Sequence, residues 1–275
     1  MEFATARDFA NARPDLPSGP VAVVLCESPR QARTTVARVA EQGAGVVIVV
    51  GEAGDIDTGE TPLVRIAEDP GRHAYRVLNA ILSALTDRWV LWLWGGEYLV
   101  FPFCETRTLS ELTSFLQDER RKVMCTYTLD LYGIDMPRPD QAPWQAELSF
   151  DRIGYQPFPD GDNGLNLYGG LAWRFEELSP GDMHQLTRPS LVRVARGAAL
   201  DRNWRFNDPD LDSVSCPWHH SPTGAIMSLR RTWRIMAHAG FTDVAGDLMW
   251  QGSTRFDWTS RQLLELGMIE PGQWF

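Results

Sequence analysis

Lysine is almost absent from this chain of 275 residues: Lys122 is the only one, and the other basic residues are arginines. The formal net charge is -10 at pH 7. General nucleic-acid binding needs a basic surface, so no nucleic-acid partner is expected. Arginine suits bidentate contacts with phosphate and carboxylate groups, although genome composition would explain the same bias.

Cysteine is also scarce, and long apolar runs are missing. The four cysteines, Cys26, Cys104, Cys125 and Cys216, show no CxxC spacing, which favours free thiols in a reducing compartment. Residues 1–20 lack the apolar centre of a signal peptide, and no apolar run has membrane-spanning length. We therefore predict a cytoplasmic protein without a membrane span, and no cofactor is expected.

Short apolar runs alternate with amphipathic segments, which is typical of an α/β protein. Strands are expected at about 21–25, 46–50, 63–66, 89–94 and 123–131. Helices are expected at about 29–42 with Ser28 as N-cap, 73–85, 109–117 with Thr108 as N-cap, 228–239 and 261–266. The strands should form one mainly parallel sheet with helices on both sides.

Three segments are expected along the chain. Residues 1–19 are predicted to be a flexible lead, and residues 20–245 the main domain. Residues 246–275 form a tail that closes on Trp274 and Phe275. Such an apolar terminus is expected to dock, either on its own body or on a protein partner.

The rest of the sequence is organised around Trp89–Pro102. Its first residues are apolar at odd and even positions alike, as in a strand buried on both faces. The run stops at Gly95-Gly96, a pair that permits a sharp turn, and the carboxylate of Glu97 follows. Open α/β sheets place their ligands where strands end in this way.

Residues 89–102 resemble the segment "dWvlflDaDEFLVfP" of bacterial family 2-like glycosyltransferases. The resemblance implies the GT-A fold, a nucleotide-diphospho-sugar transferase-like three-layer sandwich with a mainly parallel central sheet. Where the family has Asp-x-Asp, this chain has Trp94-Gly95-Gly96, and only the acid Glu97 remains. Those aspartates would hold a divalent cation, so no metal is expected at residues 94–97.

The resemblance extends to two segments on the nucleotide side of the family's site. Asp57-Thr58-Gly59 is similar to the end of "DNgStDgT", which makes Asp57 either a nucleotide contact or part of an acidic turn. The predicted helix at 73–85 resembles "AYNhaL", with Arg76 and Asn79 at its polar positions. These two side chains face either the nucleotide or solvent.

Four later segments resemble the family with changes. Asp130 lies in a match to "alMLDmY", where it would orient a sugar hydroxyl or cap a turn. Tyr168-Gly169-Gly170 matches "yGG", and Arg188 replaces the lysine of "hLtKvPLvr". In "gaLLHFKf", Ser228 replaces the histidine and Arg230 the lysine, so a second cation-site position is lost.

Aromatic residues gather in the Pro- and Gly-rich region from 133 to 168. They either form sugar-stacking surfaces or fix a long loop to the body, and they are Phe150, Tyr155, Phe158 and Tyr168. The cluster Cys216–His220 lacks the spacing of a metal site, and a metal is not expected there.

Two functions are consistent with these features. We favour a non-catalytic glycosyltransferase-like protein that binds carbohydrate or serves a structural role. The alternative is an active, metal-independent glycosyltransferase with a nucleotide sugar donor. Its leaving diphosphate would be neutralised by Arg76, Arg188 or Arg230, and Glu97 would position the donor or act as base. A Trp94 ring in the cleft favours the first function, and a ring in the core favours the second.

Overall fold

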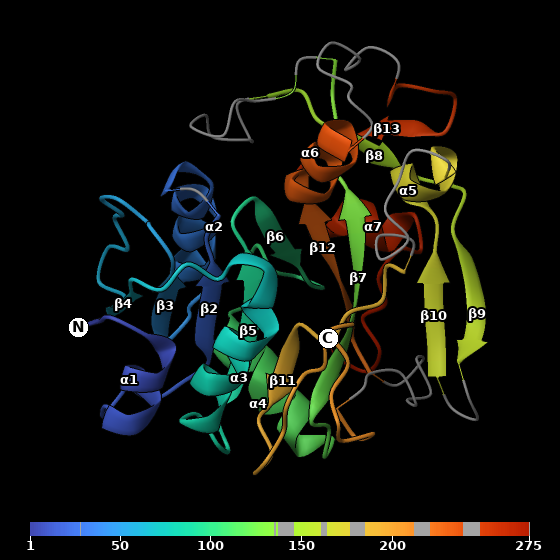
Figure 1. The fold of residues 1–275 in the computed structure, drawn as a ribbon. Coiled ribbons are helices and arrows are strands. Elements are labelled where there is room, and N and C mark those ends of the chain that lie inside the picture. The colour runs from blue at the N-terminus through green and yellow to red at the C-terminus, as the bar shows by residue number, and fades with distance from the viewer. Residues whose placement is uncertain are drawn as a thin grey trace. The chain divides into compact units, whose positions relative to one another are not determined.

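The computed structural model describes residues 1–27, 29–134, 136, 146–160, 164–176, 185–211, 221–238 and 248–274. The chain forms two compact units, whose elements are labelled in Figure 1. Unit 1 comprises Met1–Tyr98, Thr106–Met124 and Pro189–Ser213, and unit 2 comprises Leu99–Glu105, Cys125–Arg188 and Val214–Phe275. Neither unit begins or ends at the boundaries expected at residues 20 and 246.

Unit 1 contains the alternating strands and helices of the N-terminal region. Its elements are β1 (Glu2–Phe3), α1 (Ala6–Ala12), β2 (Val21–Leu25), α2 (Pro29–Glu41), β3 (Val46–Val50), β4 (Leu63–Ile66), a single-turn helix (Gly71–His73), α3 (Ala74–Ser83), β5 (Trp89–Trp94), α4 (Leu109–Asp118) and β11 (Leu191–Arg193). Two further strands, β6 (Glu97–Val100) and β7 (Val123–Asp130), begin in unit 1 and end in unit 2.

The strands of unit 1 lie in the order β1-β4-β3-β2-β5-β11. The first five are parallel, and β11 is antiparallel to β5. The predicted pairing of Val21–Leu25 with Val46–Val50 in one sheet is confirmed. Every residue of β2, β3 and β5 is buried, which explains why these strands are apolar at odd and even positions alike.

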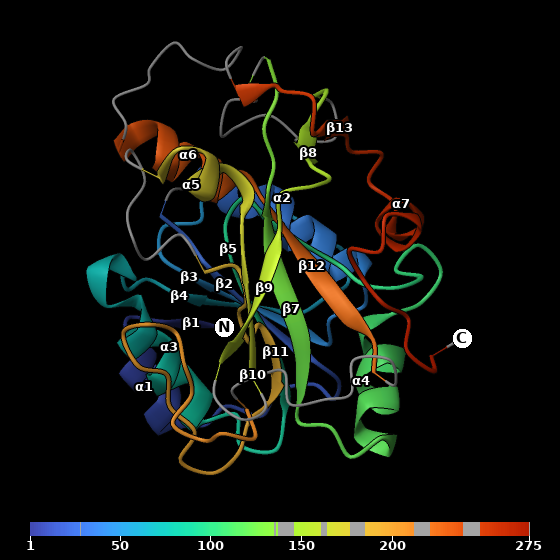
Figure 2. The same ribbon diagram turned by 90° about the vertical axis from the view of Figure 1, so that its right-hand side faces the viewer.

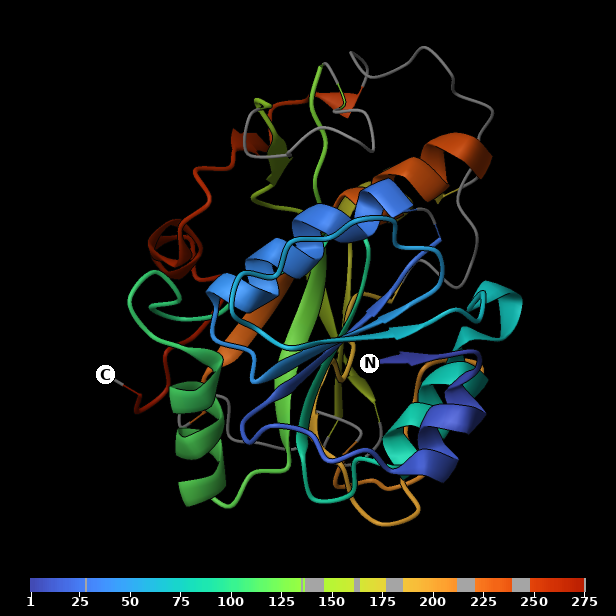
Figure 3. The same cartoon turned by 90° about the vertical axis from the view of Figure 1, so that its left-hand side faces the viewer.

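Helices cover both faces of this sheet: α2 lies on one side and α1 and α3 lie together on the other (Figure 3). Residues 1–19 were expected to be a flexible lead, but they contain β1 and α1. The helix begins with a capping box at Thr5 and buries Phe9 completely. Because this segment has only one short apolar stripe, its periodicity was too weak to predict the helix.

The ends of two helices follow the predicted signals. Helix α2 ends at Glu41, and Gly43 follows with a φ of 81°, a conformation that stops the helix. Thr108 is the N-cap of α4, as predicted: its Oγ1 accepts a hydrogen bond from the Glu111 backbone N–H at 3.2 Å. The Glu111 carboxylate accepts one from the Thr108 N–H at 2.8 Å. The predicted N-cap Ser28 lies outside the described residues.

Unit 2 combines a parallel strand pair with two small antiparallel sheets. Strand β7 runs beside β12 (Thr223–Ser228), as Figure 2 shows. The antiparallel pairs are β9 (Gln156–Asp160) with β10 (Gly164–Tyr168), and β8 (Ser149–Asp151) with β13 (Ser253–Arg255). The helices are α5 (Gly170–Arg174), α6 (Leu229–His238) and α7 (Ser260–Glu265).

The C-terminal tail docks on its own unit. Trp274 is buried, and its ring lies 6.1 Å from Phe101 and 6.2 Å from Phe103, measured between ring centroids. Phe275 lies outside the described residues. None of the helices in the described part of the chain combines the length and apolar character needed to cross a membrane.

Candidate functional site

The turn after β5 is held by hydrogen bonds to two neighbouring elements of unit 1. The Gly95 N–H donates to the Leu25 carbonyl oxygen at 2.9 Å. The Gly96 N–H donates to Oγ1 of Thr35, a fully buried residue of α2, at 2.9 Å. Gly96 has a φ of 82°, a conformation that residues with a Cβ rarely adopt. The Gly-Gly pair therefore allows the tight turn.

Glu97 and Trp94 face the interior of unit 1. Glu97 is 1% exposed, and its Oε2 accepts a hydrogen bond from the Trp94 backbone N–H at 2.9 Å. The Trp94 ring is 6% exposed and meets Trp204 edge-to-face at 5.8 Å, while Trp204 stacks on Trp92 at 4.8 Å. The Trp94 ring is thus part of the apolar core.

The other candidates in unit 1 make local contacts. Asn79 holds the backbone of Leu200 through two hydrogen bonds, each 2.8 Å long. Arg76 is exposed, and its Nε donates to the hydroxyl of Tyr75 at 3.0 Å. Asp57 is exposed and accepts from the Gly59 N–H at 2.8 Å, which closes a turn.

Asp130 lies at the end of β7 in unit 2 and has both oxygens engaged. Its Oδ1 accepts from Arg231 Nε at 2.8 Å, and its Oδ2 accepts from the Leu171 N–H at the start of α5, at 2.9 Å. Ser228 is the register partner of Asp130 on β12, and its Oγ accepts from the Arg231 N–H at 3.1 Å. Asp130 and Ser228 are thus brought together, with Arg231 as their common partner.

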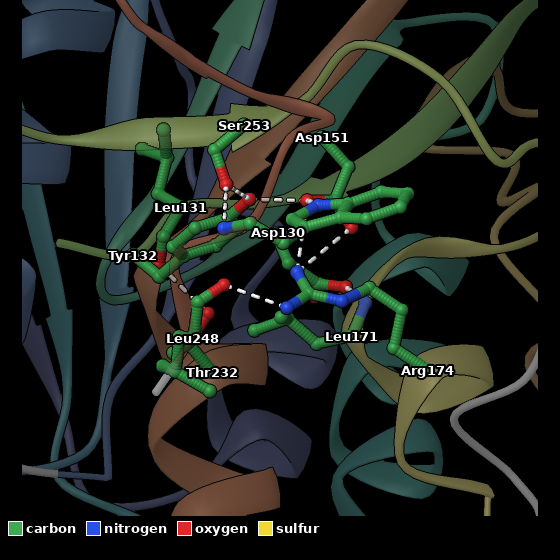
Figure 4. Close-up of polar contacts among 10 residues, drawn as sticks. Asp130, Leu131, Tyr132, Asp151, Leu171, Arg174, Thr232, Leu248 and Ser253 are labelled. Carbon is green, nitrogen blue, oxygen red and sulfur yellow. Dashed lines mark hydrogen bonds and ion pairs between the residues drawn. The ribbon is translucent and has the colours of Figure 1, made fainter. Parts of the chain in front are cut away.

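A second buried carboxylate, Asp151 of β8, collects donors from three side chains (Figure 4). Arg174 Nη1 lies 3.0 Å from its Oδ1, and Trp250 Nε1 lies 2.6 Å from the same atom. The hydroxyl of Tyr132 donates to Oδ1 as well. Burial raises the pKa of Tyr132 above its usual value, and the hydrogen bond to the Asp151 carboxylate raises it further. Tyr132 therefore stays a neutral donor at physiological pH.

Tyr155 lies near enough to both carboxylates to be influenced by their charges, without a hydrogen bond to either. Its hydroxyl is buried and has no hydrogen-bond partner among the described residues. Burial raises its pKa well above the usual value, and the charges of Asp151 and Asp130 raise it further. A Cβ on Gly169 would lie 2.7 Å from the Tyr155 ring, so the glycine permits this close approach.

Exposed aromatic rings gather on the β9–β10 hairpin and α5. Phe158 and Trp173 are each 44% exposed, with nearly parallel rings 6.4 Å apart and 19° between their planes. Tyr168 meets both rings edge-to-face, at 5.4 Å and 6.2 Å. We call Phe158, Tyr168 and Trp173 the aromatic surface. Phe150, also a stacking candidate, is fully buried against Phe256.

The remaining candidates in unit 2 are less exposed. Arg230 is buried on α6, and Arg188 is half-buried. The Arg188 N–H donates to the Thr126 carbonyl oxygen at 3.0 Å. Among the residues that the structure describes, no three histidine, cysteine or acidic side chains are grouped as a metal would require. Cys216–His220 lies outside those residues.

Sequence reasoning missed four of these residues: Asp151, Trp173, Arg174 and Trp250. Asp151 and Trp250 are 99 residues apart in sequence, so no local spacing could pair them. One signal was available for α5: Trp173 and Arg174 come a few residues after the Gly169-Gly170 pair. A glycine pair permits the close approach of another group, and the Asp130 carboxylate makes such an approach to Gly170.

Neither a protein-family model nor a curated protein matches the sequence. Among solved structures, the chain is similar to HddC from Yersinia pseudotuberculosis, with 8% sequence identity and a TM-score of 0.34. The match covers 65% of this chain and 75% of that one. A similarity this low establishes neither a family nor a function.

Proposed function

We propose that this protein binds carbohydrate through the aromatic surface of unit 2, as a glycosyltransferase-like protein without the family's metal-binding motif. The observation that carries the proposal is the exposure of Phe158 and Trp173, whose nearly parallel rings are available to solvent. Flat aromatic faces suit the apolar C–H faces of pyranose rings, and tryptophan and tyrosine combine a large contact area with few rotatable bonds.

Polar side chains suited to sugar hydroxyls share the same face of the hairpin. Gln156 is the register partner of Tyr168, and Asn166 is the partner of Phe158. Directly opposed residues of an antiparallel pair project to the same side, so both amides lie beside the rings. Gln156 is exposed, whereas Asn166 is buried and accepts from Gln185 Nε2 at 2.6 Å. Gln156 is therefore the amide available to a ligand.

Calorimetry with cello-, laminari-, chito- and malto-oligosaccharides tests the proposal. We expect one class to bind, and Trp173→Ala and Phe158→Ala each to weaken that binding about tenfold or more, about 1.4 kcal/mol. Leu266→Ala removes another exposed apolar side chain of unit 2, and it should leave the affinity unchanged. The proposal fails if the unmodified protein binds none of these glycans, or if Leu266→Ala weakens binding as much as Trp173→Ala.

A second function, metal-independent transfer from a nucleotide sugar, is supported by the position of Trp94. Because its ring packs in the core, it does not fill the space outside the end of β5. In this function Arg76, Arg188 or Arg230 would neutralise the leaving diphosphate. Glu97 would serve as base, and its Oε2 already accepts a hydrogen bond from the Trp94 N–H.

Calorimetry with nucleotides and nucleotide sugars, with and without Mn²⁺, tests this second function. Replacing Trp94 and Gly96 by aspartate would break the core and is a poor probe. Glu97→Gln is better because the amide keeps an acceptor oxygen for Trp94. If Glu97 is the base, its transfer rate should fall about 10²–10⁴-fold. Absence of nucleotide-sugar binding, or transfer that Glu97→Gln leaves intact, would eliminate the base role.

A further inference from the structure

Helix α5 is too short to be stable by itself, yet it carries Trp173, the tryptophan of the aromatic surface. It has five residues, whereas isolated helices shorter than about 12–15 residues are marginal in water. Gly170, Leu171 and Ala172 are buried, Arg174 is half-buried, and Trp173 alone is exposed. Contacts from outside the helix must therefore fix its position.

Two buried carboxylates supply those contacts, one at each end of α5. At the start, Oδ2 of Asp130 accepts the Leu171 N–H at 2.9 Å. Gly170 has a φ of 69°, and a Cβ on it would lie 2.5 Å from that oxygen, so glycine allows this contact without strain. At the end, Arg174 Nη1 lies 3.0 and 3.3 Å from the two oxygens of Asp151, and Nη2 donates to the Leu248 carbonyl oxygen at 2.7 Å.

Aromatic rings surround the guanidinium of Arg174 as well. Its Cζ lies 4.8 Å from the Trp250 ring centroid, 5.3 Å from that of Phe175 and 5.8 Å from that of Tyr132. These distances fall within the range of cation–π attraction. The side chains of Arg174 and Asp151 are 18% and 2% exposed, so the pair is largely desolvated.

A buried ion pair rarely adds stability beyond what an apolar pair would give, because desolvation of both charges is costly. What a buried ion pair does provide is a defined geometry, because the planar guanidinium makes several hydrogen bonds in fixed directions. Because Trp173 is the neighbour of Arg174, a fixed Arg174 also fixes the backbone from which the Trp173 ring projects.

We propose that Arg174 is a positioning residue for glycan recognition, which holds α5 so that Trp173 lies parallel to Phe158 before a ligand arrives. This inference rests on the proposed carbohydrate-binding function. A surface that is already ordered loses less conformational entropy on binding, so fixing α5 raises the affinity without any contact between Arg174 and the sugar.

The test compares Arg174→Met and Arg174→Lys with Arg255→Met, using the oligosaccharide that the unmodified protein binds. Arg255 is a matched control because it pairs with Glu147 in unit 2 but is 70% exposed. We expect Arg174→Met to weaken binding about tenfold, Arg174→Lys to weaken it less, and Arg255→Met to have no effect. Hydrogen exchange of the amides at residues 170–175 should quicken in Arg174→Met and not in Arg255→Met.

Chemical rescue separates positioning from general damage. In Arg174→Ala, added ethylguanidinium should enter the vacated site between Asp151 and Trp250, slow the exchange at residues 170–175 and restore binding. Unchanged affinity in Arg174→Met with binding still lost in Trp173→Ala would overturn the inference and leave the proposed function standing. If the unmodified protein binds no glycan, the proposed function fails, and unchanged exchange in Arg174→Met would independently refute the positioning role.

Discussion

The two units of this protein bury different kinds of side chain. In unit 1, β2, β3 and β5 are apolar throughout. Among the described residues of this unit, Glu97 is the one charged side chain that is buried. In unit 2, the corresponding charged residues are Asp130, Asp151, Arg230 and Arg231. Apolar burial is non-directional, whereas hydrogen-bonded ion pairs specify one arrangement.

This difference separates a scaffold from a surface that requires exact placement. A parallel sheet covered by helices on both faces tolerates volume-conserving changes in its core. The contacts that hold α5 do not tolerate the loss of one partner, because the other charge then stays buried without compensation. The comparison is sharpened by changing contacts of each kind and comparing the stabilities of the units.

The largest effect is expected for Asp151→Ala in unit 2. The substitution leaves the Arg174 guanidinium without its carboxylate and removes the acceptor of Tyr132 and Trp250. Breaking a buried pair in this way costs about 3–5 kcal/mol. Urea denaturation, with hydrogen exchange to localise the change to unit 2, measures the free energy of unfolding.

Asp210→Ala in unit 1 is the control for loss of an ion pair. Asp210 lies 2.7 Å from Lys122, but their side chains are 68% and 47% exposed. Such a pair contributes about 0–1 kcal/mol. Similar losses in Asp151→Ala and Asp210→Ala would contradict the distinction between the units.

The sequence predicted unit 1 better than unit 2 for a physical reason. Each of the expected strands at 21–25, 46–50, 63–66 and 89–94 is a local apolar run, and each was found with the expected bounds. The α4 cap at Thr108 was equally local. Strand β1 and helix α1 were missed because they are short.

In unit 2, the order arises from contacts between residues far apart in sequence. Asp130 was singled out from a resemblance, but its partner Arg231 is 101 residues away. Tyr155, Phe158 and Tyr168 were named as stacking candidates, although nothing local showed that the Tyr155 hydroxyl is buried and Phe158 exposed. The proposed roles of Asp57, Arg76, Asn79 and Glu97 stay predictions.

Asn79→Ala is the next largest change and concerns unit 1. Asn79 satisfies both the N–H and the carbonyl oxygen of Leu200, so its loss leaves two half-buried backbone groups without this partner. We expect a loss of about 1–3 kcal/mol in the free energy of unfolding. Asn79→Asp keeps an acceptor for the Leu200 N–H but has no donor for the Leu200 carbonyl oxygen, so it should also lose stability.

The same variant examines the predicted contact of Asn79 with a nucleotide. A fully folded Asn79→Ala protein that loses nucleotide-sugar binding would assign the side chain to a ligand. A loss of stability with no change in binding would assign it to the Leu200 segment. Circular dichroism and calorimetry on the same sample separate these results.

Alkaline pH should lower the stability of unit 2, because two of its tyrosines are neutral in the folded protein. Tyr132 and Tyr155 both have a raised pKa, mainly because they are buried. In the unfolded chain they lose their protons near pH 10, so their contribution is complete below that pH and is lost as the pH rises towards the folded pKa. For each tyrosine, the free energy of unfolding should fall by about 1.4 kcal/mol per pH unit between the unfolded and the folded pKa.

Tyr155→Phe isolates one of these tyrosines. At neutral pH the free energy of unfolding should stay equal or rise, because a buried hydroxyl without a hydrogen-bond partner is removed. Above about pH 10 the variant should lose stability less steeply than the unmodified protein. Urea denaturation across this range measures both effects, and a large loss of stability at neutral pH would show that the hydroxyl has a partner.

The smallest effect is expected for helix caps, which occur in both units and should not distinguish them. Thr108 caps α4 in unit 1, and Thr259 caps α7 in unit 2, where its Oγ1 accepts from the Gln262 N–H at 3.3 Å. Replacing either threonine by alanine leaves a helix N–H without its acceptor and should cost about 1 kcal/mol. Serine at the same position keeps the hydroxyl and should restore most of the loss. If Thr259→Ala instead costs several times as much as Thr108→Ala, the sensitivity of unit 2 extends beyond its buried charges, and the ion pairs are not what sets the two units apart.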